Sequence, residues 1–197
     1  MPPSRREELV DSAMKVFSCN GFHNTGLDLI LKDSGISRMT LYNHFKSKDE
    51  LIVAAMRRRD ELFRNSLMKF VESGDRNPID QILSIFDCLD SWFNEPDFHG
   101  CMFINASAEF CDSDSPPRRV AAEHKLEILR YITGLCNTAK LNDPDELAQQ
   151  INLLVEGAIV TAHVVGRVNN NNHGVSESAQ RAKAMTHKLI RDSAQDE

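Results

Sequence analysis

A segment near the N-terminus combines a guanidinium, a carboxamide and hydroxyl groups on one face of a predicted helix. Residues 38–45 have the sequence Arg-Met-Thr-Leu-Tyr-Asn-His-Phe. On a helix, Leu41 and Phe45 lie four positions apart and share a face that can pack on neighbouring helices. The opposite face presents the side chains of Arg38, Met39, Thr40 and Asn43. Because Arg matches guanine and Asn matches adenine in the major groove of DNA, the segment predicts a recognition helix.

Two helices are predicted before this segment. The apolar residues of positions 5–20 recur at helical spacing, and we expect Gly21 to end this first helix in the left-handed conformation. Thr25 and Asp28 have the spacing of a capping box, which predicts that a second helix begins here and runs to about residue 33.

The turn and the caps around the segment complete a helix-turn-helix pattern. Gly35 permits a tight turn, and Ser37 is expected to cap the third helix at residues 38–44. Ser47 and Glu50 have capping-box spacing and predict a long fourth helix to about residue 72.

The rest of the chain also has helical periodicity, with no alternating strand pattern. Helices are expected at about 80–93, 100–110, 117–140, 143–168 and 176–192, with a polar loop at 169–174. The sequence therefore predicts an all-α fold of about nine helices. We expect a three-helix DNA-binding domain at residues 1–50 and a larger helical domain at residues 51–197.

An ordered set of residues over this N-terminal region resembles the helix-turn-helix of the TetR/AcrR family of transcriptional regulators. The set is Gly21-Phe22, Thr25, Ile30, Gly35-Ile36-Ser37, Leu41-Tyr42, His44-Phe45, Lys48 and Leu51. The chain departs from the family pattern at Leu31, Ser34 and Met39. Since Met39 changes the face that meets the groove, the operator sequence does not follow from the resemblance.

The resemblance implies a homodimer that binds a double-stranded DNA operator. Tyr42 and His44 touch phosphates in the family, and Thr25 and Lys48 are placed to add phosphate contacts. The full predicted DNA-binding set is Thr25, Ser37, Arg38, Met39, Thr40, Tyr42, Asn43, His44 and Lys48. For three of these, a structural role is the alternative: a cap or packing for His44, a core position for Tyr42, and a plain surface position for Met39.

The predicted helix at residues 143–168 is apolar on more than one side, so it needs cover from more than one side. In the family, the last two helices form a four-helix bundle with the same pair from a second subunit. The predicted dimer interface is Leu153, Val160, Val164, Ala182, Met185 and Leu189. The alternative is that both helices form only an intramolecular core.

The family places an effector pocket among the central helices. Candidate walls for an unknown small molecule are Phe86, Leu89, Trp92, Phe93, Met102, Phe103, Phe110 and Leu129, and an ordinary core explains them equally well. Cys101 follows Gly100 at a predicted helix start, which favours a thiolate. Some relatives with a similar Gly-Cys sense electrophiles or oxidants, so a redox input through Cys101 is an alternative, beside an inert buried Cys.

Composition and motifs exclude several other classes of protein. The chain has a net charge of −6, but residues 1–60 alone have a net charge of +2, with ten Lys/Arg and eight Asp/Glu. No catalytic, metal or cofactor motif is recognisable, so no enzyme activity, metal or cofactor is expected. No apolar run reaches the ~18 residues that span a bilayer, and the N-terminus does not resemble a secretory signal. We therefore expect a cytoplasmic protein with no membrane partner.

Together these patterns predict a DNA-binding regulator, namely a repressor that a small-molecule effector releases from a palindromic operator. Two alternatives are a repressor that senses electrophiles or oxidants through Cys101, and a helical binding protein with a vestigial helix-turn-helix.

Overall fold

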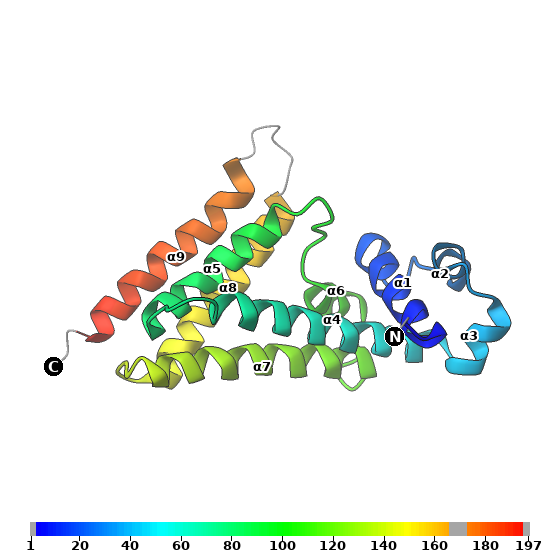
Figure 1. Cartoon of the computed structure of the whole chain (residues 1–197), viewed down its shortest axis with the longest axis horizontal. Coiled ribbons are helices and arrows are strands. Elements are labelled where there is room, and N and C mark those ends of the chain that lie inside the picture. Colours follow the sequence, from blue (N-terminus) through cyan, green and yellow to red (C-terminus); the bar gives the residue numbers. More distant parts are fainter. Residues whose placement is uncertain (1–2, 166–172, 195–197) are drawn as a thin grey trace. The chain divides into compact units, whose positions relative to one another are not determined.

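The computed structural model describes residues 3–165 and 173–194 (Figure 1). Within these residues it contains nine α-helices and no strand, which confirms the predicted all-α fold. The helices are α1 (Arg5–Asn20), α2 (Leu27–Ser34), α3 (Arg38–His44), α4 (Lys48–Val71), α5 (Pro78–Phe93), α6 (Met102–Glu109), α7 (Pro116–Thr138), α8 (Pro144–Val165) and α9 (His173–Ala194). They form two compact units, Met1–Phe63 with Met102–His124, and Arg64–Cys101 with Lys125–Glu197.

The first unit contains the helix-turn-helix together with α6. Its core consists of fully buried apolar side chains from α1 to α4, among them Leu9, Phe17, Ile30, Leu41 and Leu51. These residues recur at helical spacing along each short helix, so each helix turns one apolar stripe inward.

Most helix caps in this unit are those predicted from the sequence. Ser4 and Glu7 form a reciprocal capping box at the start of α1, and the Ser37 hydroxyl accepts from the backbone N–H of Thr40 at 3.2 Å. The Ser47 hydroxyl accepts from Glu50 N–H at 3.1 Å, as a capping box requires. The Glu50 carboxylate, however, accepts from the N–H of Lys46 rather than from that of Ser47.

Two expectations about the end of α1 and the start of α2 are wrong. Gly21 has a positive φ of 79°, but its ψ of 167° is extended rather than left-handed helical. Thr25 does not cap α2, because the N-cap residue is Gly26 and no side chain bonds to the first turn. The Thr25 hydroxyl instead donates to the carbonyl of Gly21 at 2.6 Å and is buried there.

The second unit is built around α5, α8 and α9. Helices α8 and α9 lie side by side (Figure 1), and the Ser178 hydroxyl donates to the Ala158 carbonyl at 3.2 Å. The ammonium of Lys183 on α9 donates to both carboxylate oxygens of Asp87 on α5 at 2.7 Å. These contacts fix three helices around a core that includes Phe86.

The element boundaries differ slightly from those expected. Helix α9 begins at His173 rather than Ser176, and α5 begins at Pro78 rather than residue 80. Most of the predicted polar loop, residues 169–172, lies outside the described residues. Two boundaries between the compact units fall inside α4 and α7 rather than at residue 50, so the division at residue 50 stays a functional prediction.

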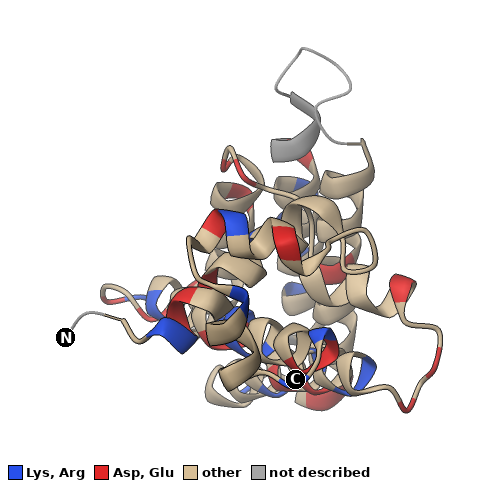
Figure 2. Ribbon diagram, turned by 90° about the vertical axis from the view of Figure 1, so that its right-hand side faces the viewer, with Lys and Arg blue, Asp and Glu red and all other residues tan. Residues whose placement is uncertain are grey.

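Charged residues of both signs occur along the same helices (Figure 2). The N-terminal helix α1 shows this mixture, with Arg5, Arg6 and Lys15 beside Glu7, Glu8 and Asp11. Among the described residues, no helix has the length and apolar character needed to cross a membrane.

Candidate functional site

Helix α3 has one buried and one exposed face. Leu41 on α3 and Phe45, its C-cap residue, are fully buried and anchor the helix. On the other face Met39 is 74% exposed and Tyr42 is 50% exposed. Arg38, Asn43 and His44 are also exposed, and Thr40 is half-buried. The structure therefore presents the predicted base-contacting residues together on one accessible surface.

Two of these side chains, those of Thr40 and Arg38, form hydrogen bonds with neighbouring residues of the motif. The hydroxyls of Ser37 and Thr40 lie 2.9 Å apart and share a hydrogen bond. The guanidinium of Arg38 donates to the carboxylate of Asp28 on α2, and this bond raises the pKa of Arg38. A guanidinium has five N–H donors, so Arg38 retains donors for a base edge while it bonds to Asp28.

Thr25 and Lys48 were both predicted to lie at a helix start and to contact a DNA phosphate, but their environments differ. Thr25 is fully buried, so its hydroxyl is not displayed for a phosphate, contrary to expectation. Lys48, the first residue of α4, is half-buried and its ammonium donates to the carbonyl of His23 at 3.3 Å. Of these two side chains, only that of Lys48 is accessible at the surface.

Polar bonds fix α2 against α1. The Ser12 hydroxyl lies 2.7 Å from Oδ2 of Asp33, and the Lys15 ammonium donates to Oδ1 of Asp33 at 2.8 Å. The Lys15 and Ser12 hydrogen bonds hold the pKa of the Asp33 carboxyl below its usual range. The carboxylate thus stays charged and joins the two helices that support α3.

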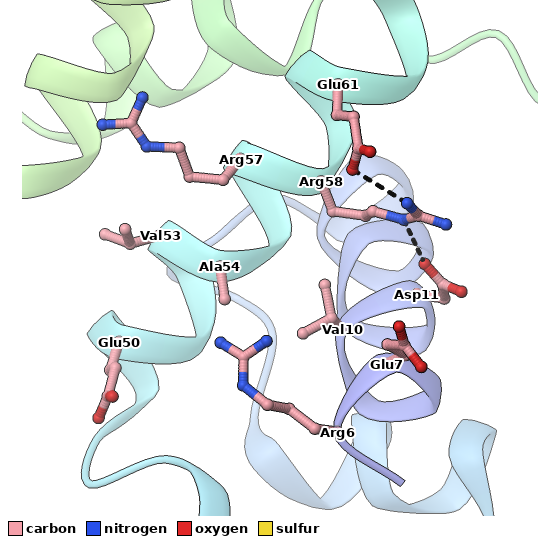
Figure 3. Close-up of a pocket in the computed structure, with 10 residues that line it drawn as sticks. All are labelled: Arg6, Glu7, Val10, Asp11, Glu50, Val53, Ala54, Arg57, Arg58 and Glu61. Atoms are coloured by element: carbon pink, nitrogen blue, oxygen red, sulfur yellow. Dashed lines mark hydrogen bonds and ion pairs between the residues drawn. The ribbon is translucent and has the colours of Figure 1, made fainter. Parts of the chain in front are cut away.

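The Arg57-Arg58-Arg59 run does not form a DNA-binding face. Arg57 pairs with Glu123 at 2.5 Å, and Arg59 lies over the Phe63 ring at 5.9 Å. Arg58 donates to Asp11 at 3.2 Å and Glu61 at 3.0 Å (Figure 3). Consecutive residues on a helix point about 100° apart, so these three side chains reach different partners.

Figure 3 also shows a cavity between α1 and α4, of about 460 Å³. Val10, Val53 and Ala54 contribute its apolar lining, and charged side chains of both signs, including Arg6, surround them. The Arg6 guanidinium lies over the Phe45 ring at 5.1 Å, and Arg58 is already paired with carboxylates. The mixed charge gives this cavity no preference for a phosphate.

The comparisons with known proteins agree with this geometry. Residues 9–55 match the family described as bacterial regulatory proteins, tetR family. The HTH-type transcriptional repressor NemR of Escherichia coli is 24% identical over 167 residues, covering 81% of this chain and 84% of NemR. Residues 9–55 therefore form a helix-turn-helix of the kind that the tetR family model describes.

Solved structures of TetR-family regulators share the fold of this chain over almost its whole length. A TetR-family regulator from Streptomyces coelicolor superposes with a TM-score of 0.84 at 24% identity, over 97% of this chain and 96% of that chain. The reduced form of E. coli NemR superposes with a TM-score of 0.82 at 22% identity, over 94% and 96%.

The candidate effector-pocket residues are mostly tightly packed. Phe86, Leu89, Phe93, Met102 and Phe103 are buried, whereas Trp92, Phe110 and Leu129 are partly accessible. In the second unit, a cavity of about 210 Å³ lies between α4 and α7 and is lined by other residues, among them Leu67, Met68, Ile128 and Tyr131. The packing thus resembles the ordinary core that was the alternative interpretation.

Cys101 directly precedes α6 and lies in a polar environment of the second unit. It is buried, and the Lys125 ammonium lies 3.5 Å from its Sγ. Lys125 also donates to both carboxylate oxygens of Glu156, at 2.8 and 2.7 Å. Gly100 has a φ of 79°, and a methyl group there would collide with the His163 ring, so the Gly-Cys pair approaches α8 closely.

The predicted dimer residues divide into exposed and buried groups. Leu153 and Val164 on α8 are 72% and 71% exposed, and Val160 and Met185 are also exposed. Leu189 is half-buried, and Ala182 is buried within the protomer against neighbouring helices, so it adds little to an outer face. The apolar face open to a partner is therefore formed mainly by α8.

Sequence reasoning missed two polar contacts of the first unit, one partly exposed and one buried. The Glu109 carboxylate accepts from the backbone of residues 22 and 23, and His124 pairs with Asp60. Single Glu, His and Asp residues far apart in the sequence form no pattern that could indicate these pairs. Among the described residues, no group of three or more His, Cys, Asp or Glu side chains is arranged to hold a metal ion.

Proposed function

We propose that this regulator is a homodimeric repressor that binds a palindromic operator through α3 and leaves it when a small-molecule effector binds. The observation that supports this most directly is the exposed face of α3, with Arg38, Met39 and Asn43 opposite the buried Leu41. A two-fold dimer presents two such helices to successive major grooves. Acting on bacterial DNA would place the protein in the cytoplasm.

The direction of regulation and the second subunit are also part of this proposal. NemR is named a repressor, which favours repression here. The exposed apolar residues of α8, Leu153, Val160 and Val164, favour a second copy as the partner, because such a face is covered in a stable assembly.

The test is a fluorescence-anisotropy titration with DNA from the region upstream of the chain's own gene, at two salt concentrations. Asn43→Ala with Tyr42→Ala removes a base contact and a phosphate contact, whereas Asn137→Ala changes an exposed Asn on α7. We expect tight, salt-sensitive binding that only the double variant loses. Equal binding of all three proteins, or none at either salt, would leave a helical binding protein with a vestigial helix-turn-helix.

We infer that the effector is apolar or aromatic and that it opens the packed cluster around Trp92 and Phe93. Aromatic side chains suit such a ligand, and Trp92 is partly accessible beside the buried Phe93. Calorimetric titration with small apolar compounds, followed by DNA release, tests this. The inference fails if no compound binds saturably and lowers DNA affinity.

Contacts at Cys101 favour a second candidate input, the oxidation of its thiol. The Lys125 ammonium donates to Sγ of Cys101 at 3.5 Å, and the thiolate is the form that attacks hydrogen peroxide to give a sulfenic acid and hydroxide. Burial raises the pKa of Cys88 and of Cys136 to about 11, so those thiols remain protonated. Cys101→Ser should abolish peroxide-triggered DNA release, and Cys19→Ser, at an exposed thiol, should not. Release that survives in Cys101→Ser excludes Cys101 as the sensor.

A further inference from the structure

The turn between α1 and α2, residues 21–25, binds a carboxylate from α6. The backbone N–H of Phe22 donates to both oxygens of Glu109, at 3.0 and 2.9 Å. The N–H of His23 donates to Oε2 of the same carboxylate at 2.7 Å. Glu109 is the last residue of α6 and is 87 residues from Phe22 in the sequence. These bonds therefore join α6 to the helix-turn-helix through a long-range contact.

The backbone of the turn is shaped for this anion. Two successive backbone N–H groups, those of Phe22 and His23, donate to the same carboxylate, and Gly21 before them has a positive φ of 79°. A Cβ at Gly21 would lie 3.0 Å from Oε1 of Glu109. Glycine at this position therefore provides both the backbone angle and the space for the carboxylate.

Ring contacts between the same two segments add to the hydrogen bonds. Phe22 is fully buried, and its ring centroid lies 5.7 Å from that of Phe110, the residue after Glu109. The His23 ring lies 4.9 Å from Phe110, and its Nδ1 is 3.3 Å from Glu109. The end of α6 thus contacts the turn through a charged group and an aromatic ring together.

Two carbonyls of the turn accept hydrogen bonds, one from within the turn and one from α4. Thr25 donates to the Gly21 carbonyl at 2.6 Å, next to the start of α2. Lys48, the first residue of α4, donates to the His23 carbonyl at 3.3 Å. One short turn therefore connects the ends of α1, α2 and α4, which together hold α3.

We propose that Glu109 is a positioning residue for DNA binding, whose carboxylate fixes the α1–α2 turn and thereby the orientation of α3. This rests on the proposed DNA-binding function. The consequence for regulation is direct: an event that shifts α6 withdraws the carboxylate and leaves two turn amides without an acceptor. Helix α6 begins one residue after Cys101.

The experiment compares Glu109→Gln with Asp114→Asn, which removes one charge from an exposed residue shortly after α6. Backbone amide exchange is measured residue by residue, and DNA affinity is measured with the upstream duplex. We expect exchange at Phe22 and His23 to rise in Glu109→Gln and DNA affinity to fall about tenfold, because hydrogen bonds to a charged acceptor are lost. Asp114→Asn should change neither. Glu109→Asp, which keeps the charge on a shorter side chain, should lie between Glu109→Gln and the wild type.

The outcomes distinguish a failure of the proposed role of Glu109 from a failure of the proposed DNA-binding function. Faster exchange confined to the turn with weaker DNA binding supports it, since a purely structural role would raise exchange throughout the first unit. Unchanged exchange, or faster exchange with unchanged DNA affinity, overturns the role of Glu109. Absence of DNA binding by the wild-type protein overturns the proposed function, while the exchange data still show whether Glu109 holds the turn.

Discussion

The Nδ1 atom of His124 on α7 lies 2.8 Å from Oδ1 of Asp60 on α4, and both residues are buried. The Phe103 ring of α6 stacks on the same imidazole, with ring centroids 3.7 Å apart and planes inclined by 13°. Helices α4, α6 and α7 of the first unit therefore meet at one histidine. This contact fixes the beginning of α6, as the Glu109 contact fixes its end.

Replacing Asp60 with Asn should destabilise the protein, because the buried imidazole loses a charged acceptor. We expect the free energy of unfolding to fall by about 1–3 kcal/mol, measured by guanidinium denaturation. Asp114→Asn, at an exposed position, should leave the free energy of unfolding nearly unchanged. Equal stability of the two variants would mean that the His124–Asp60 contact contributes nothing net.

Asp33→Asn should reveal a stability contribution that depends on pH. Its pKa is lowered in the folded protein by Lys15 and Ser12, so the unfolded chain binds a proton at higher pH than the folded chain does. The stabilisation is therefore complete above the unfolded pKa of about 4 and disappears as pH falls through the folded value. Urea denaturation at several pH values should show a difference from wild type near neutrality that shrinks in acid. A difference that stays constant with pH would contradict this explanation.

Lys48→Ala and Arg38→Ala should weaken DNA binding in different ways. Loss of a phosphate contact lowers affinity for all sequences and reduces the slope of log K against log salt by about one. Loss of Arg38 should cost about 1–3 kcal/mol on the operator and relax base preference at one position. Anisotropy titrations across a salt series on specific and random duplexes measure both effects. Identical behaviour of the two variants would argue against base contact by Arg38.

Much of the DNA-binding motif could be predicted from the sequence, because it depends on local patterns. The cap at Ser37 and the buried Leu41 follow from side-chain chemistry and helical spacing, and both are confirmed. Thr25 shows where this reasoning fails. Its type and spacing predicted a cap, but a nearer acceptor, the Gly21 carbonyl, captures its hydroxyl.

The tertiary contacts of the site could not be predicted in the same way. Glu109 is a single acidic residue at a helix end, and only the fold brings it to amides 87 residues away. Cys101 was singled out for its place before a helix, yet its polar neighbour Lys125 comes from another helix. Apolar periodicity also predicted that Ala182 and Met185 share a role, whereas the first is buried in the protomer and the second is exposed.

Charged substitutions on α8 should disrupt the proposed dimer. Lys in place of Val164 or Leu153 would put an ammonium in the apolar contact, where burial of an unpaired charge is costly. Sedimentation equilibrium should show a shift from dimer to monomer for both variants. Leu126→Lys, at a 51% exposed apolar residue of α7, is the control and should remain dimeric. An unchanged mass for all three variants would place the partner elsewhere.

The close approach of Glu109 to Gly21 has an evolutionary consequence. A side chain at residue 21 and a long carboxylate at residue 109 compete for one space, since a Cβ would come within 3.0 Å of Oε1. The two positions should therefore change together during descent: relatives that lack glycine at the first should have a shorter or neutral residue at the second. Covariation between these distant positions, tested across many homologous sequences, would show that selection treats them as one unit.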